Sequence, residues 1–373
     1  EASFERHTKS SRNDNLKQEV SPWLKEPLRS VGQMTGICTF GMEKNAVGLG
    51  HTARVFGRAL IMPNLKPPVR QTCDALNYRR RILQALEAMP KYGYFNPLMT
   101  IYLTDDTSIA DIVIAAASEH VLAAKLYPAN ATTNSAAGVT DIGKLDPVFG
   151  AMEKNGLVLS IHGETLKNDQ GEIDIFDREA SFIETLDSII ERHPDLRIVV
   201  EHVTTRKMVE FVQAAGPNVA ATITAHHLLS NRNALFKGGI RPHHYCLPVL
   251  KREEDRQALL AAATSGSPQF FLGTDSAPHA RDTKEQLRLA GCYTAHAALL
   301  LYAEAFDTVD ALDRLEGFAS HFGADFYRLP RNTGTVTLIR EPWTTPETFP
   351  YGEKTLVPLR AGEKVLWQIA DAD

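Results

Sequence analysis

The run LVLSIHGE, residues 157–164, is short and apolar and ends on polar side chains. An apolar run of this length, bounded by turn signals, is typical of a buried strand. Six more runs share the pattern, and they decide the fold when they are taken together. They are RALIMPNL (58–65), LMTIYLTD (98–105), LAAKLYPA (122–129), RIVVEHV (197–203), VAATITAHHL (219–228) and FFLGTDSA (270–277).

Amphipathic segments lie between these runs, among them 73–89, 177–193 and 252–266. Strands that alternate with helices predict parallel βαβ units and an α/β fold. Seven runs are one strand short of a TIM (β/α)8 barrel, and the only room for another strand is before residue 58. The proline-rich, strand-like tail after Thr333 is expected to pack outside the barrel.

Composition excludes several classes of function. The net charge of −5 gives no basic footprint for nucleic acid. No apolar run approaches the roughly 18 residues that span a membrane, and residues 1–30 lack the apolar core of a signal peptide. The four cysteines are widely spaced without a CxxC pair, which favours a reducing cytoplasm and argues against a thiolate zinc site. Position 1 is Glu, so we expect the native start to lie elsewhere.

Polar side chains stand at the C-terminal ends of the predicted strands, and in a parallel barrel these ends form the active-site face. Each one alone has an ordinary structural explanation, such as a packed histidine, an outward-reaching lysine, a helix cap or a turn. Together, two imidazoles and a carboxylate are ligands that zinc prefers. A lysine among them is anomalous, because an ammonium repels a metal unless it is neutral or chemically converted. The residues are Asn64, Lys125, His162, His202 and Asp275.

Longer motifs surround these residues. They are KLYPANATTNS (125–135), IHGE (161–164), VEHVTT (200–205), RPHHYCLPVLKR (241–252) and GTDSAPHAR (273–281). From about residue 51 to its end, the chain resembles the shorter bacterial dihydroorotases of the amidohydrolase superfamily. Confusion with sister enzymes such as hydantoinases or allantoinases is disfavoured by the length of the motifs.

The resemblance implies a TIM barrel with two Zn2+ ions per chain. Lys125 would be carboxylated by CO2, and the resulting carbamate would bridge the two ions. His162 and His202 would bind the second zinc, while Asp275 would bind the first zinc and act as the general acid and base. Asn64 and His279 would hold the substrate carboxylate. The remaining implied contacts are the backbone at Leu247 and Ala290, against the substrate ring, and a closing loop with Thr132 and Thr133.

The implied reaction is the reversible cyclisation of N-carbamoyl-L-aspartate to L-dihydroorotate in pyrimidine biosynthesis, in a cytoplasmic homodimer. Two alternatives stay open. One is a non-catalytic scaffold that keeps the remains of a site, and the other is a different cyclic-amide hydrolase. A panel of hydantoins and allantoin against dihydroorotate would separate the second alternative.

The position of strand one departs from the family. The family carries HxH there, followed by an arginine that clamps the substrate carboxylate, whereas this chain reads SVGQMTGICTFGME at 30–43 and has no HxH anywhere. The stretch can be back-translated into codons, with third bases freely chosen. The resulting DNA string can then be read in a shifted frame that starts at the third base of the first codon. In that frame the string encodes RRPDDWHLHLRDG, which is the family motif. KEQLRLAGC (284–292) shows a similar departure from a cysteine-rich family stretch.

We therefore hypothesise that residues 27–50 and 286–289 are out-of-frame translations, arising from sequencing errors or gene lesions. A genuinely diverged strand is the alternative. On this hypothesis 1–50 is a poorly assigned segment with a corrupted strand one, and 51–373 is the hydrolase barrel with its C-terminal packing segment. Taken literally, the chain keeps only Lys125 and Asp275 at the first zinc, so we expect one zinc or none and little activity.

Overall fold

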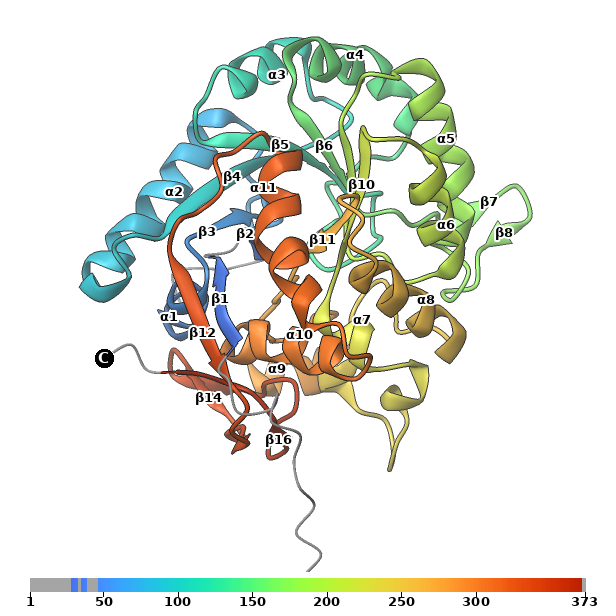
Figure 1. Cartoon of the computed structure of the whole chain (residues 1–373). Helices are drawn as coiled ribbons and strands as arrows, with labels where there is room; N and C mark the ends of the chain where they lie inside the picture. The colour runs from blue at the N-terminus through green and yellow to red at the C-terminus, as the bar shows by residue number, and fades with distance from the viewer. Residues whose placement is uncertain (1–27, 33–34, 39–45, 371–373) are drawn as a thin grey trace, which may run out of the picture.

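The computed structural model describes residues 28–32, 35–38 and 46–370, and it shows a curled parallel sheet ringed by helices (Figure 1). Eight strands follow one another in the order β11-β10-β9-β6-β5-β4-β3-β2. The end strands β11 and β2 lie in contact, so the sheet curls into a TIM barrel. The strands are β2 Thr35–Cys38, β3 Arg58–Ile61, β4 Asn96–Tyr102, β5 Val121–Leu126, β6 Val158–Ile161, β9 Ile198–Val200, β10 Val219–Ile223 and β11 Phe270–Leu272.

The seven predicted strands are confirmed, and the predicted room for an eighth is filled by β2. Thr35 to Cys38 pair in parallel with Arg58 to Ile61 of β3. The stretch quoted for strand one is therefore partly described, but residues 33–34 and 39–43 lie outside the described residues. The segment boundary predicted at residue 50 falls inside α1.

Helices cover the outside of the sheet because amphipathic segments pack their apolar faces against the strands. The predicted helices at 73–89 and 252–266 are confirmed as α2 and α8, whereas α5 begins at Ile183, six residues later than the pattern predicts. A 3-10 turn, Ala180–Phe182, directly precedes α5, and the Glu179 side chain before it turns into the protein to bind Thr204 and Thr205. The helices are α1 Ala46–Val55, α2 Thr72–Glu87, α3 Ile109–Ala116, α4 Asp146–Asn155, α5 Ile183–Arg192, α6 Arg206–Ala214, α7 Ala225–Leu229, α8 Glu253–Thr264, α9 Arg281–Leu287, α10 Ala298–Asp307 and α11 Phe322–Phe326.

The barrel interior is built in layers, because side chains two residues apart on a strand share a face. The lower layer is apolar and includes Leu98, Ala123, Val199 and Phe271. Helix α11 closes this end of the barrel (Figure 1). Tyr327, at the end of this helix, packs on Phe271.

Two residues further along the strands the interior becomes polar, with Thr100, Lys125, Ser160, Glu201 and Thr222 all buried. This second layer is the floor beneath the C-terminal ends of the strands. Gly273 faces Thr222 so closely that a Cβ at position 273 would lie 2.5 Å from the threonine side chain. The close approach therefore requires glycine on β11's C-terminal extension.

The C-terminal tail packs outside the barrel, as predicted. Strand β12 (Thr335–Ile339) pairs antiparallel with β1 (Leu28–Gly32) and with β17 (Gln368–Ile369). Further two-stranded pieces are β13 Trp343–Thr344 with β16 Lys364–Val365, and β14 Phe349–Tyr351 with β15 Lys354–Leu356. The hairpin of β7 Lys167–Asn168 and β8 Gly171–Glu172 projects from the rim (Figure 1).

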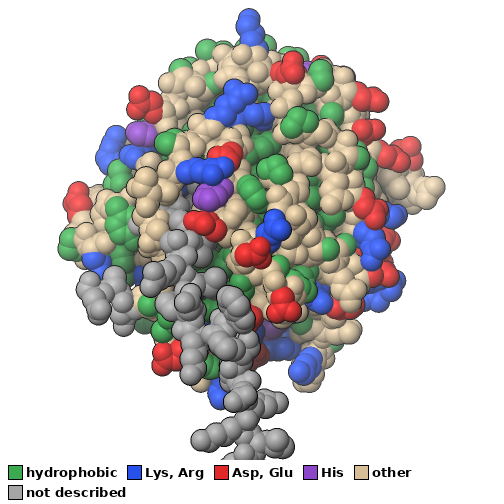
Figure 2. Space-filling view, viewed as in Figure 1, with side chains coloured by type: hydrophobic (Ala, Val, Ile, Leu, Met, Phe, Trp, Pro, Cys, Tyr) green, Lys and Arg blue, Asp and Glu red, His purple; other side chains and the backbone are tan. Residues whose placement is uncertain are grey.

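Acidic and basic side chains intermix on the face shown in Figure 2. Within the described ranges, every helix is too short or too polar to cross a membrane.

Candidate active site

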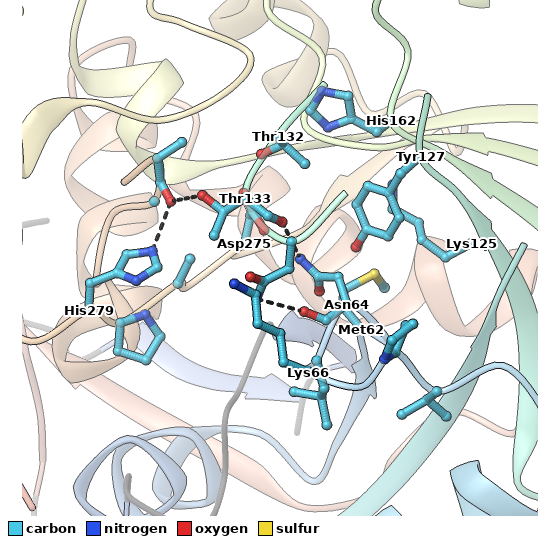
Figure 3. Close-up of a pocket in the computed structure, with 18 of the residues that line it drawn as sticks. Met62, Asn64, Lys66, Lys125, Tyr127, Thr132, Thr133, His162, Asp275 and His279 are labelled. Atoms are coloured by element: carbon cyan, nitrogen blue, oxygen red, sulfur yellow. Dashed lines mark hydrogen bonds between the residues drawn. The ribbon is translucent and has the colours of Figure 1, made fainter. Parts of the chain in front are cut away.

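A cavity of about 1210 Å3 opens at the C-terminal ends of the strands. Figure 3 shows Lys125, Tyr127 and His162 on one side and His279 on the other, with Asn64 and Thr133 between them. Residues far apart in the sequence are thus brought together, including every site residue that the sequence predicts. The predicted residues that line the cavity are Asn64, Lys125, Thr132, Thr133, His162, His202, Leu247, Asp275, His279 and Ala290.

Lys125 lies at the bottom of the cavity, at the end of β5, with 1% of its surface exposed. Its Nζ is 4.8 Å from the centre of the Tyr127 ring and has no hydrogen-bond partner among the described residues. Burial lowers the pKa of Lys125 to about 8, although the charges of Glu201 and Asp275 oppose the shift. The shift makes the neutral amine accessible near physiological pH, although the ammonium is still the larger fraction.

His162 and His202 face each other from β6 and β9, with ring centroids 4.9 Å apart. The His162 Nε2 lies 2.7 Å from an oxygen of Glu164, and both side chains are buried. His202 Nδ1 has no hydrogen-bond partner within the described part of the chain. Desolvation, followed by the charges of His162 and Lys125, lowers the pKa of His202 well below its usual value. Neutral imidazole with an unused lone pair is the form that binds a metal.

Glu201 supports this pair from below. Its carboxylate accepts hydrogen bonds from the hydroxyls of Ser160 and Thr222, the latter at 2.7 Å. The Thr222 hydroxyl oxygen in turn accepts the backbone N–H of His202 at 2.7 Å. Burial raises the pKa of Glu201, against the opposing charge of Lys125. The network ties the backbone of one candidate ligand to the floor of the barrel.

Two candidate ligands hold left-handed backbone conformations, His202 with φ 47° and Asp275 with φ 40°. Such conformations cost of order 1–3 kcal/mol in non-glycine residues and persist only where neighbours enforce them. After His202 the enforcing group is Glu179, which is 1% exposed. It accepts the backbone N–H groups of Thr204 and Thr205, each at 2.8 Å, and both of their hydroxyls.

Hydrogen bonds of Thr133 and His279, drawn as dashed lines in Figure 3, hold the other side of the cavity. The Ala290 carbonyl accepts the Thr133 hydroxyl at 3.1 Å and His279 Nε2–H at 2.8 Å. Asn64 Nδ2 donates to the Thr133 carbonyl at 3.3 Å, and Asn134 Nδ2 donates to the Asn64 carbonyl at 3.0 Å. The loop that carries Thr133 is therefore folded over the cavity. Burial lowers the pKa of His279 to about 4.

Sequence reasoning assigned no role to Glu164, Glu201, Tyr127 or Glu179. The first two stand inside the quoted motifs IHGE and VEHVTT. The spacing of two residues between Val199 and Glu201 was the available signal, because it places both side chains on the inner face of β9. Glu179 lies in a connecting segment, where no periodicity marks an inward-facing carboxylate.

A TIM barrel with imidazoles, a carboxylate and a buried lysine at its strand ends defines the amidohydrolase class, and the amidohydrolase family model matches residues 63–225. The dihydroorotase of Acaryochloris marina is 58% identical over 325 residues, which cover 87% of this chain and 92% of that protein. The dihydroorotase of an Azoarcus species is 60% identical over 323 residues, which cover 86% and 92% of the two chains. The chain belongs to the dihydroorotase family.

Solved structures agree with this assignment. The dihydroorotase of Campylobacter jejuni superposes with a TM-score of 0.83 at 31% identity, covering 93% of this chain and 98% of that chain. The dihydroorotase of Saccharomyces cerevisiae, solved in complex with 5-fluoroorotic acid, gives a TM-score of 0.82 at 30% identity, covering 91% and 98%.

Proposed function

We propose that this chain carries the site of a metal-dependent dihydroorotase, which interconverts N-carbamoyl-L-aspartate and L-dihydroorotate. The observation that carries the proposal is the meeting of Lys125, His162, His202 and Asp275 in one cavity. The family's function and the match over most of the chain support the same reaction. We also infer a cytoplasmic homodimer, in line with the sequence analysis.

The donor set fits a metal in part. The amine of Lys125 and Nδ1 of His202 are buried polar atoms with no hydrogen-bond partner among the described residues. Because buried polar atoms are normally paired, these two atoms are available to bind a cation. Lys125, as a carbamate, His162 and His202 would hold one zinc ion. A second zinc would have Lys125 and Asp275, but β2 reads TGIC and offers no imidazole. When bound, zinc would activate water and polarise the ring carbonyl.

The side chains have separate tasks in this proposal. Asp275 takes the proton of the attacking water and delivers it to the leaving nitrogen, and the steps reverse in cyclisation. The neutral form of the Lys125 amine, which the lowered pKa makes accessible, is the form that reacts with CO2. Asn64 and His279 bind the substrate carboxylate. His279 is neutral in the free protein, but a neighbouring carboxylate raises a histidine pKa and favours the imidazolium that binds it.

The departures at 27–50 and 286–289 bear on activity. We infer that they are out-of-frame translations, so that the chain as written lacks the imidazoles and the arginine of strand one. Resequencing the DNA across codons 25–55 and 284–292 tests this. Single-base insertions or deletions that restore HLHLR would make the gene an ordinary member of the family, whereas an unchanged frame would leave a true divergence.

Purified protein gives the direct test of function. We expect fewer than two zinc ions per chain at this cavity and weak turnover of dihydroorotate, abolished in Asp275→Asn. Turnover of a hydantoin or allantoin in preference to dihydroorotate would contradict the proposed substrate. Complete inactivity together with a correctly folded barrel would favour the scaffold alternative, for which the sequence of β2 is the one supporting observation.

A further inference from the structure

A second cluster of metal-binding side chains lies outside the cavity lining. His226 and His227 come from α7, and Cys246 comes from the segment before Leu247. One donor atom from each of the three lies within 4.8 Å of the others. All three are buried, with 2%, 2% and 1% exposed. The cluster is thus a closed group of soft donors in the protein interior.

The distance between Cys246 Sγ and His227 Nε2 is 3.6 Å. A tetrahedral zinc with bonds of about 2.3 Å to sulfur and about 2.05 Å to nitrogen separates these two donors by about 3.6 Å. The distance between these two donor atoms therefore already matches the value expected when a metal is bound. Without a metal, His227 Nε2 donates to the Pro248 carbonyl at 3.1 Å.

His226 supplies an independent observation. Both of its ring nitrogens are buried, and neither has a hydrogen-bond partner among the described residues. Leaving a buried polar atom unpaired destabilises the fold, so a packed, neutral histidine should satisfy at least one nitrogen. A cation bound to one of these nitrogens would remove the penalty.

His227 is also held as metal-bound histidines are held. Its Nδ1 lies 2.7 Å from the hydroxyl of Thr224, which caps α7. A histidine that binds metal through one nitrogen usually hydrogen-bonds through the other, which fixes its tautomer and ring orientation. Thr224 can accept the Nδ1 proton when Nε2 binds the metal.

Cys292 lies near this group but is not one of the three donors. It is 1% exposed, and its thiol donates to the His243 carbonyl at 3.5 Å. The neighbouring Cys246 thiol and the charge of Lys284 lower the pKa of the Cys292 thiol. The Lys284 ammonium is itself bound by the carbonyls of Tyr245, Leu289 and Gly291, at 3.0, 2.8 and 2.6 Å.

We propose that His226, His227 and Cys246 form a structural site for a thiophilic divalent cation such as zinc. The three donors are buried and stand apart from the residues that line the cavity, which favours a structural rather than a catalytic ion. Leu247, which lines the cavity, adjoins Cys246. The ion would therefore fasten α7 to one wall of the candidate active site. Widely spaced cysteines argued against such a site in the sequence, but the fold brings one of them to a pair of histidines.

Cobalt tests the proposal, because thiolate bound to Co2+ gives a near-ultraviolet charge-transfer band that imidazole and carboxylate ligands do not give. The full-length chain would carry Cys38→Ser and Cys73→Ser, which removes a thiol whose side chain lies outside the described structure and an exposed one. Under a non-chelating reductant we expect one equivalent of Co2+ to produce the band. Adding Cys246→Ser should abolish it.

His226→Gln keeps a polar side chain in place and guards against misfolding of the cysteine variant. We expect it to weaken Co2+ binding at the thiolate site at least about tenfold. His193→Gln, at another buried histidine, is the matched control and should leave the band unchanged. Asp275→Asn should abolish turnover but keep the band, which separates this proposal from the proposed function. Absence of the band in the reduced parent, or its persistence in folded Cys246→Ser, would overturn the proposal.

Discussion

Replacing Glu179 with Gln tests whether this buried carboxylate enforces the backbone conformation at His202. The two carboxylate oxygens accept four donors, the N–H and hydroxyl groups of Thr204 and Thr205. A glutamine amide presents only one acceptor oxygen, so two buried donors lose their partner. At about 1–3 kcal/mol for each unpaired donor, we expect Glu179→Gln to lower the free energy of unfolding by about 2–6 kcal/mol.

Urea unfolding followed by circular dichroism measures this loss. The control is Glu184→Gln, at an exposed position on α5. We expect the stability of the control to stay within about 0.5 kcal/mol of the parent. The segment after His202 should also lose its fixed conformation. Zinc affinity should then fall at least about tenfold in protein that is still folded, because an outer-layer group no longer orients the ligand. A Glu179→Gln protein within 1 kcal/mol of the parent, with unchanged zinc affinity, would refute this reasoning.

Three further outcomes are expected. Replacing residues 30–43 with the segment RRPDDWHLHLRDG should add about one zinc ion per chain over the parent and increase turnover by two or more orders of magnitude, measured by metal analysis and dihydroorotate hydrolysis. Asp275→Asn in that restored protein should lower kcat by about 10²–10⁴, measured at saturating substrate. His279 has a folded pKa of about 4, below its unfolded value of 6.5, so it costs stability as pH falls from 6.5 toward 4. His279→Gln should therefore lose less stability than the parent over that range in urea titrations.

The sequence predicts the barrel well because its strands are apolar on both faces. Each inner strand reads as a short apolar run whatever its neighbours are, so 157–164 and 197–203 were recognisable without any knowledge of their partners. Polar side chains at the ends of such runs stood out for the same reason. The later start of α5 at Ile183 was not predictable, because the pattern of apolar residues does not distinguish the 3-10 turn Ala180–Phe182 from the first turn of an α-helix.

Long-range contacts account for the other gaps. In the sequence Glu201 is an ordinary acidic residue. Only the fold brings Ser160 of β6 and Thr222 of β10 within hydrogen-bonding distance of it. Cys246 is 19 residues from His227 in the chain, and only the fold brings its sulfur to 3.6 Å from the His227 Nε2. Spacing rules recognise metal sites whose ligands are close in sequence, and they are silent where ligands converge from separate loops.

The pairing of β1 with β12 constrains the order of events during synthesis. Leu28 lies opposite Leu338, so the first described strand has no partner of its own until almost the entire chain has left the ribosome. The barrel strands from β3 to β11 can associate in the order in which they emerge. Strand β1 therefore stays unpaired until β12 has been synthesised. Ribosome-bound chains truncated before residue 335 should therefore be attacked by protease near residue 30, while the full-length chain is protected there.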